Sequence, residues 1–511
     1  MKLLQLLSPA IVEADAPRTS TTRALSAIVV AIASTAVLAL GGCAGSAGIA
    51  PAARTLSPAR VGMAAEAGAA PKGTADWWRS FGDPTLDSLI NRALADSPNL
   101  KLVQARLARA GAGVAASQAG NGPLVTGSAE VTRERFSANT IYPPPLGGHI
   151  YSLGNAQIAG SWEFDFFGRN RAAIEAAVGT QRAAQAEVQA ARMLLSSSVA
   201  RTYVQLGRLL EQRDVARGAL KQREATLRLV NQRVLAGLDT AVEQRQGEGA
   251  LPEARLLIEQ LEEQIALTRH SLAALTAQPM DALDGLLVPL HAVQVVAVPV
   301  AVPADLLGRR ADITAARWRI EAARSDTAAA HAQFYPNVNL MAFAGLSSLG
   351  LDRLFHSTSE QWGASPAIHL PIFDSGRLRA NLRIKTADLD AAIESYNGAV
   401  FDAVRDAADQ VSSLQSVTRQ QVEQVSALGS AESAYDLATQ RYTAGLGTYL
   451  TVLNAEATVL NQRRLSADLK ARALDAQIGL IRALGGAITA DTDLATRATA
   501  NAQQVAPKNI E

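Results

Sequence analysis

The 511-residue sequence is poor in the features on which most enzymes, metalloproteins and nucleic-acid-binding proteins depend. It has one cysteine, so no intrachain disulfide can form. Its six histidines are scattered without metal-ligand spacing, and neither an HExxH pair nor a Walker-type Gly-Lys-Ser/Thr loop is present. Lys and Arg (48) balance Asp and Glu (47), which argues against nucleic acid as a partner. With no constellation of nucleophile, base and orienting residue, the sequence predicts a protein that is not an enzyme and holds no metal or dissociable cofactor.

Aromatic side chains are also scarce, at 5% of residues, although 48% of the chain is hydrophobic. Apolar residues recur in steps of four and three positions over long stretches, and this 3.5-residue repeat keeps one stripe of a helix facing a supercoiling partner. An unbroken helix from Gly168 to Gly237 would be on the order of 100 Å long. Its stripe consists of Leu195, Val199, Thr202, Leu206, Leu209, Arg213, Ala216, Leu220, Arg223, Leu227, Val230 and Val234.

The chain contains one unit twice. Residues 232–240 read QRVLAGLDT, and residues 440–448, which follow at a spacing of 208, read QRYTAGLGT. Each copy interrupts a helical repeat with a glycine. We therefore predict that each is the tip of a long helical hairpin, at 236–240 and 444–448. Pro123 and Pro336 also stand at corresponding places, which indicates a duplication of half the chain.

The boundaries of the two units follow from these landmarks. The first, residues 76–286, is predicted to contain a helix from Pro84 to about Gln118, a β-hairpin at 124–166, a long helix, the tip and a returning helix. The second, residues 304–486, repeats this order with its β-hairpin at 337–373. The strands of this hairpin are expected to run from Asn337 to about Gly345 and from Gln361 to Phe373. Residues 287–303 form a proline-studded linker, or equatorial segment. Residues 487–511 are polar and aperiodic, which is typical of a disordered tail.

Within the predicted hairpins the hydrophobic period changes from 3.5 to 2. From Leu153 to Asp165 one face is polar, while the other carries Ile158, Trp162 and Phe164. Strands of about 10 residues with one polar and one apolar face have the length and pattern of strands that cross an outer membrane. A soluble sheet packed on a core would alternate in the same way. The export signal at the N-terminus favours the membrane interpretation.

The N-terminal segment has the pattern of a secretory signal. Basic residues precede an apolar run at 24–40, and small residues follow it. A retained membrane helix or a chance cysteine are the alternatives. Leu40-Gly41-Gly42-Cys43 resembles a bacterial lipobox, which implies removal of residues 1–42, covalent lipid (including palmitate) on Cys43 and, with Ala44 next, sorting to the outer membrane. Residues 43–75, mostly Ala, Gly and Pro, are predicted to be a lipidated flexible tether.

Longer motifs resemble one protein family. Residues 77–94 read WWRSFGDPTLDSLINRAL. This is similar to the opening of the lipoprotein branch (NodT-like or OprM-like) of the TolC-type outer-membrane factors of RND efflux systems. Residues 306–313, LLGRRADI, resemble the family's LLxRRPDI, with Ala311 in place of its proline and Arg317 where a glutamate is common. Together with the tips, the matching motifs cover about residues 76–486.

The resemblance implies an α+β membrane protein. Three chains, each giving four strands, would form a twelve-stranded outer-membrane β-barrel that continues as a periplasmic coiled-coil barrel of helices. From the residues alone, four strands cannot close a barrel, and neighbouring chains must pair with the free edges. That argument permits a dimer or a trimer; the family implies the homotrimer.

The implied function is the outer-membrane exit duct of a tripartite RND-type multidrug efflux pump. Conduction would be passive and gated, with a periplasmic adaptor, an inner-membrane RND transporter and outer-membrane lipid as partners, and a role in antibiotic resistance. One alternative is a type I secretion exit duct. Another, from a different class, is a periplasmic adaptor or a structural coiled-coil lipoprotein.

The tips are the candidate gate. In the family the second tip carries a tyrosine before its glycine, and Tyr442 matches it; the acidic positions that constrict the pore fall on Thr451 and Asn454, and a gate arginine falls on Gly447. Asp239 and Glu243 are the carboxylates that remain, and Arg233 and Arg441 could pair with them or with a partner protein. The alternative is that the tip charges are solvated and have no gating role. The candidate residues are Arg233, Gly237, Asp239, Glu243, Arg441, Tyr442, Gly445, Thr448, Thr451 and Asn454.

The repeated Ala-Gly-Leu of the tips resembles the grooves in which the family's adaptor docks its helical hairpin. Gly237 and Gly445 would allow close backbone approach. A tight turn that requires glycine is the simpler explanation, and both can hold.

Overall fold

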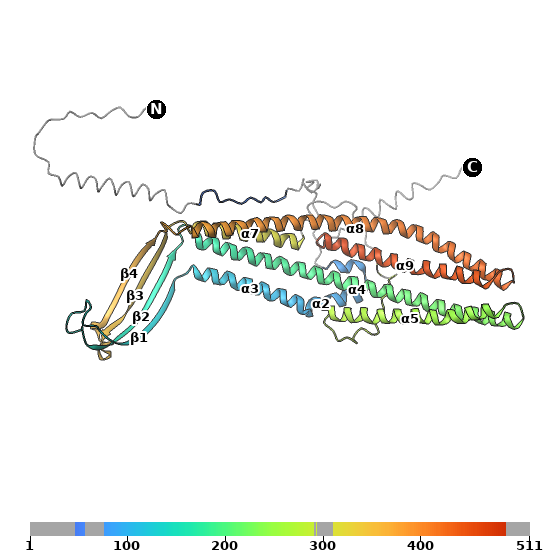
Figure 1. Ribbon diagram of the computed structural model, residues 1–511, viewed down its shortest axis with the longest axis horizontal. Helices are drawn as coiled ribbons and strands as arrows, with labels where there is room; N and C mark the ends of the chain where they lie inside the picture. Colours follow the sequence, from blue (N-terminus) through green and yellow to red (C-terminus); the bar gives the residue numbers. More distant parts are fainter. Residues whose placement is uncertain (1–45, 57–75, 291–292, 294–309, 487–511) are drawn as a thin grey trace, which may run out of the picture. The chain divides into compact units, whose positions relative to one another are not determined.

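The computed structural model describes residues 46–56, 76–290, 293 and 310–486. The chain divides into two compact units, and each combines segments from both halves of the sequence (Figure 1). One unit contains Asn121–Arg171 and Thr327–Thr386 and holds the strands, and the other holds most of the helical residues. The predicted signal peptide, Cys43 and the tail at 487–511 lie outside the described residues, as do most of the tether and of the linker at 287–303.

A four-stranded antiparallel sheet joins the two predicted hairpins. Its strands lie in chain order: β1 (Leu124–Arg135), β2 (Ile150–Phe164), β3 (Asn337–Leu349) and β4 (Glu360–His369). The sequence predicted a shorter third strand and a fourth that ran to Phe373. The difference arises because β3 pairs with β2 from Val338 to Leu349, which lies opposite Leu153, whereas β4 ends before Pro371.

The sheet has one apolar and one mainly polar face. The register places Val125 opposite Gly160, Ile158 opposite Ala344, and Ala344 opposite Trp362, so these residues share a face. The other face carries polar residues that include Asn155 and Gln361, and Gln361 Nε2 donates to Asn155 Oδ1 at 2.9 Å. Large apolar side chains on the first face are exposed; Trp362 is 82% accessible. Both outer strands, β1 and β4, have an edge without a partner strand among the described residues.

The long helices of the second repeat have the same lengths as those of the first. Helices α4 (Arg169–Leu235) and α8 (Arg377–Thr443) are each 67 residues long, and α5 (Ala241–Leu275) and α9 (Tyr449–Ala483) are each 35. The long helix predicted between Gly168 and Gly237 is thus present without interruption. Its apolar stripe is the face that packs: Val199, Leu206 and Val230 are fully buried.

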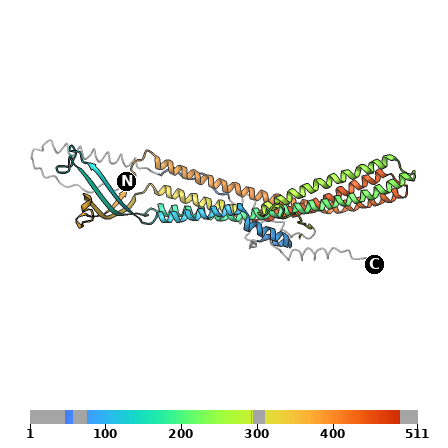
Figure 2. The ribbon, with the colours of Figure 1, turned by 90° about the horizontal axis from the view of Figure 1, so that it is seen from below.

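Polar contacts define the order in which the long helices lie side by side. Arg217 of α4 bonds Glu262 of α5 at 2.7 Å, Arg208 of α4 bonds Asp468 of α9 at 2.7 Å, and Gln424 of α8 donates to the carbonyl of Gln462 in α9 at 2.7 Å. Over these contacts the order is α8, α9, α4, α5, as Figure 1 shows, and Figure 2 presents the same helices from below. Next to the tips α8 also packs against α4. Helices α5 and α8 form the two outer edges of this arrangement.

The N-terminal segment that contains Trp77 and Trp78 packs against the middle of α4. Trp77, Trp78 and Phe81, in a short 3-10 helix (Trp77–Phe81), are each 1% exposed and belong to one apolar cluster with Tyr203 and Leu206. The prediction of a single helix from Pro84 to about Gln118 was wrong. Two helices are present, α2 (Pro84–Asp96) and α3 (Pro98–Gly120), because Pro98 disfavours helical geometry at the residue before it and suits the start of a new helix. Helix α7 (Ala311–Ala332) is the counterpart of α3 in the second sequence repeat, residues 304–486.

Asp83 fixes this N-terminal segment to α4, and its loss should destabilise the helical unit. One carboxylate oxygen accepts from the Thr85 and Leu86 amides at the start of α2, and the other accepts from the Tyr203 hydroxyl at 2.6 Å. Asp83→Ala should lower the free energy of unfolding by about 2 kcal/mol, since it removes a helix cap and strands a buried hydroxyl. Urea unfolding followed by tryptophan fluorescence measures this. Tyr203→Phe should cost less because the cap remains; an equal or larger cost would contradict the capping role.

Candidate functional site

Both tips are tight turns built around a left-handed glycine. After α4, Gly237 has φ +71° and the amide of Leu238 donates to the carbonyl of Arg233 at 2.9 Å. After α8, Gly445 has φ +74° and the amide of Leu446 donates to the carbonyl of Arg441 at 2.8 Å. Such helix ends favour glycine because a side chain in this conformation is strained. The glycines therefore serve the turn, as the simpler explanation required.

A threonine begins the returning helix at each tip. Thr240 caps α5 and forms a reciprocal capping box with Glu243, whose carboxylate accepts from the Thr240 amide at 2.9 Å and also from its hydroxyl. The hydroxyl bond lowers the pKa of Glu243. Thr448 caps α9 by accepting from the amide of Thr451, and the two hydroxyls lie 3.0 Å apart. Glu243 is thus engaged in local structure.

Three of the predicted residues form one cluster that joins the two tips. Arg233 Nε and Nη2 donate to Asp239 at 3.0 and 3.3 Å, and the Tyr442 hydroxyl donates to the same carboxylate. The Arg233 guanidinium lies over the Tyr442 ring, 4.7 Å from its centroid. Tyr442 also contacts the Tyr449 ring and belongs to an apolar cluster with Val230. Residues 203 positions apart in sequence thereby hold α4 and α8 together at their ends.

The cluster is buried, and its electrostatics are mutually reinforcing. Tyr442 is 1% exposed, and the side chains of Arg233 and Asp239 are 12% and 9% exposed. Burial alone would raise the pKa of Asp239, but hydrogen bonds from Arg233 and Tyr442 outweigh it and hold the pKa below its ordinary value. Burial, followed by the bond to Asp239, raises the pKa of Tyr442. The hydroxyl therefore stays protonated and remains a donor to a charged acceptor.

The remaining predicted residues lie on the tips outside this cluster. The Arg441 guanidinium donates to the carbonyl of Leu446 at 3.4 Å. Thr451 and Asn454 are exposed on α9. The structure therefore brings Arg233, Asp239 and Tyr442 together and leaves the other candidates at the surface or in helix caps.

A buried ion pair above the tips was not predicted. Arg223 of α4 bonds Glu456 of α9 at 3.2 Å and donates to the carbonyl of Ala250 in α5 at 2.9 Å, so it ties three helices together. Glu456 is 5% exposed, and burial raises its pKa despite Arg223. The sequence did indicate that an ion pair could form here, because Arg223 lies in the apolar stripe of the long helix, and a buried cation requires an anionic partner. The sequence does not say which carboxylate that partner is.

The tip cluster should weaken only in acid. A carboxyl group whose pKa is lowered on folding adds stability above its ordinary pKa of 3.8, and that stability is lost as pH falls through the lowered value. We therefore expect the tips to stay joined from neutral pH down to about pH 4 and to separate below it. Glu456, with a raised pKa, contributes in the opposite sense, so the Asp239→Asn variant isolates the Asp239 effect. Hydrogen exchange of the tip amides between pH 7 and pH 3 measures this; separation starting near pH 6 would contradict it.

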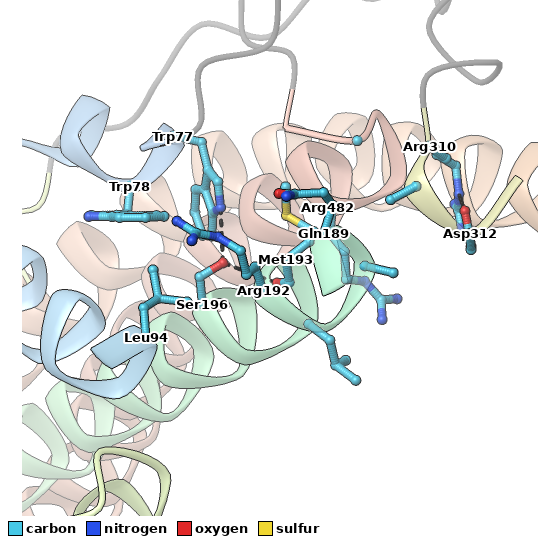
Figure 3. A pocket seen from close by; sticks show the side chains of 14 residues that line it. Trp77, Trp78, Leu94, Gln189, Arg192, Met193, Ser196, Arg310, Asp312 and Arg482 are labelled. Carbon is cyan, nitrogen blue, oxygen red and sulfur yellow. Dashed lines mark hydrogen bonds and ion pairs between the residues drawn. The ribbon is translucent and has the colours of Figure 1, made fainter. Parts of the chain in front are cut away.

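A cavity of about 410 Å³ lies beside the tryptophan pair in the helical unit (Figure 3). Trp77 and Met193 line it together with Arg192 of α4 and Arg482 of α9, and Trp77 Nε1 donates to Ser196 Oγ at 3.2 Å. Two further lining residues, Arg310 and Gly485, lie at the limits of the described segments. We therefore do not interpret this cavity as a ligand site. No group of residues suited to hold a metal ion is present in the described part of the chain.

A family model described as "Outer membrane efflux protein" matches residues 89–278 and 302–486, which include both tips. The chain belongs to this family. Its members are efflux conduits in the outer membrane, so the chain is an exit duct of an efflux system and not an enzyme. This assignment also decides against the adaptor and structural-lipoprotein alternatives.

Individual relatives of the outer membrane efflux protein family agree with this. The chain is 34% identical over 434 residues to the multidrug resistance outer membrane protein MdtQ of Escherichia coli O157:H7, covering 80% of this chain and 87% of that one. It is 31% identical over 418 residues to the pyoverdine export outer membrane protein OpmQ of Pseudomonas aeruginosa, covering 81% and 88%. The crystal structure of the outer membrane protein VceC from Vibrio cholerae superposes with a TM-score of 0.77 at 36% identity, over 82% of this chain and all of that one.

None of the helices in the described residues combines the length and the hydropathy that a membrane-spanning helix requires.

Proposed function

We propose that three copies of the chain form the gated outer-membrane duct of a tripartite, RND-type multidrug efflux pump. The observation that carries the proposal is that, within the described residues, each compact unit has two unpartnered edges. Strands β1 and β4 present free edges at the two sides of the sheet in this part of the chain. In lipid an unpaired strand edge is costly, so β4 of one chain would pair with β1 of the next, and three chains would close a twelve-stranded barrel.

The helical unit also supports the assembly of three chains into a closed ring. Its outer helices expose apolar side chains, with Leu256 and Leu267 on α5 and Val422 and Val425 on α8 each more than half accessible. Residues of this kind seldom remain exposed on a long helix unless another helix covers them. Packing α5 of one chain against α8 of the next would bury them and close a ring of twelve long helical segments around a periplasmic tunnel.

The tip cluster would be the gate of this duct. Each chain has two helical hairpins, α4 with α5 and α8 with α9, and the Arg233–Asp239–Tyr442 contact holds their ends together within the chain. An entrance can widen only if one hairpin moves away from the other. The cluster would therefore favour the closed entrance, and its dissociation would accompany opening.

The outer surface of the tips would receive the periplasmic adaptor. Leu238 and Leu446 occupy equivalent places in the two copies and are 65% and 70% exposed. Apolar side chains repeated at both tips offer a similar docking surface to two adaptor hairpins. The adaptor would in turn connect the duct to an inner-membrane RND transporter. The lipid on Cys43, outside the described residues, would add anchorage in the outer membrane.

The assembly is tested by purifying the full-length protein from outer membranes in mild detergent. We expect a trimer that migrates as one species without heating and as a monomer after heating, and a Cys43→Ser variant that loses metabolically incorporated palmitate but still forms trimers. Accumulation of the wild-type protein as a water-soluble monomer in the periplasm would contradict the proposal.

A further inference from the structure

The surface of α9 that begins at the second tip is polar but carries no charge. From Tyr442 to Ala455 the chain contains no acidic or basic residue. Exposed hydroxyl and amide side chains recur on α9 in steps of three and four, which places them on one face of the helix. They are Thr451, Asn454, Thr458 and Asn461.

Two carboxylates next to this surface are bound within the chain. Asp239 is bound by Arg233 and Tyr442, and Glu456, at the end of the uncharged stretch, is buried against Arg223. Asp436 is exposed on the neighbouring helix α8. The four-residue stripe on α9 itself therefore carries no carboxylate that would concentrate cations.

The N-terminus of α9 adds a weak positive electrostatic potential. The N-terminus of a helix carries a partial positive charge, and an acidic residue in the first turn normally offsets it. Helix α5 has Glu243 in that place, whereas the first turn of α9 has no acidic residue and is capped by the Thr448 hydroxyl. The two tips, otherwise equivalent, thus differ in charge at the start of the returning helix.

We propose that this stripe on α9 lines a neutral entrance, through which anionic and uncharged small molecules pass as readily as cations. The inference rests on the proposed function, since it requires that α9 face the lumen. Selectivity for cations in a pore depends on rings of acidic side chains. At this entrance Thr451 and Asn454 supply hydrogen-bonding groups in place of such rings. The substrate class therefore extends to organic anions such as small carboxylic acids.

Reversal potentials in a potassium chloride gradient test the proposal on the purified trimer in a planar bilayer. The wild type should show a potassium-to-chloride permeability ratio near one. The double variant Thr451→Asp/Asn454→Asp places six carboxylates at the entrance of a trimer. It should become about tenfold more cation-selective, and millimolar spermidine should block it but not the wild type. Both sites are exposed, and an acidic residue at Thr451, in the first turn of α9, favours the helix.

A control adds negative charge elsewhere, one carboxylate in each chain. Gln246→Glu lies on the exposed surface of α5, and it should leave the permeability ratio unchanged. A wild-type channel that strongly prefers potassium would overturn the neutral entrance while leaving the duct intact. An unchanged ratio in the double variant, or an equal change in the Gln246→Glu control, would show that the α9 stripe does not line the entrance. A trimer that forms no channel would overturn the proposed function and this inference with it.

Discussion

Asp239→Ala is expected to open the duct and to raise its conductance at neutral pH. The substitution leaves the Arg233 guanidinium and the Tyr442 hydroxyl without their common acceptor, in a site where Tyr442 is almost inaccessible to water. Loss of a largely buried, charge-assisted contact costs about 2 kcal/mol in each chain. Because this cost falls on the closed arrangement, the ratio of separated to joined hairpins in each chain should rise about thirtyfold. Single-channel recording in a planar bilayer measures it.

Two controls give this prediction its specificity. Tyr442→Phe removes only the hydroxyl and keeps the ring under Arg233, so it should increase opening less than Asp239→Ala. Glu248→Ala breaks an exposed ion pair with Arg245 on α5, 2.7 Å long, and should leave opening unchanged because exposed pairs contribute little. An Asp239→Ala channel that stays as closed as the wild type would show that the cluster is structural and does not gate.

Gly445→Trp should abolish efflux while the trimer still forms. A Cβ atom added at Gly445 meets no other atom within 4 Å, so the indole of a tryptophan would project from the tip, across the surface proposed to receive the adaptor. The positive φ of +74° adds strain of roughly 1–2 kcal/mol, which is small beside the stability of an assembled trimer. Drug susceptibility of cells that depend on the protein measures efflux, and unheated electrophoresis measures assembly.

The control Gly445→Ala has the same backbone strain without the bulk. It should retain most of the efflux activity, and Gly237→Trp, at the equivalent place on the first tip, should resemble Gly445→Trp. If Gly445→Ala also abolished efflux, the turn itself and not the docking surface would be responsible. If Gly445→Trp lost the trimer, the docking role would be refuted.

The long elements could be predicted because their signals are local. A 3.5-residue repeat interrupted only at glycine requires a continuous helix, and α4 and α8 run the expected length. Alternation between apolar and polar residues located both hairpins. The break at Ser97 was missed because the apolar repeat continues across it, although Pro98 carried the information. The far end of β3 was missed because its pairing with β2 decides it: Leu349 lies opposite Leu153, 196 residues earlier in the chain.

The site was predictable as a list of residues but not as a set of contacts. Repetition of the tip singled out Arg233, Asp239 and Tyr442, and the sequence allowed Arg233 to pair with either Asp239 or Glu243. Only the fold shows that Asp239 is held by both tips while Glu243 closes a capping box on its own helix. Arg223 and Glu456 are 233 residues apart, and no local pattern connects them.

The most direct test of the duct is the single-channel conductance of the purified protein without its signal peptide, compared with its Asp239→Ala variant, in a planar bilayer. We expect discrete openings in the wild type and longer or larger openings in the variant. A trimeric protein that inserts into the bilayer but conducts nothing in either form would contradict a gated outer-membrane duct.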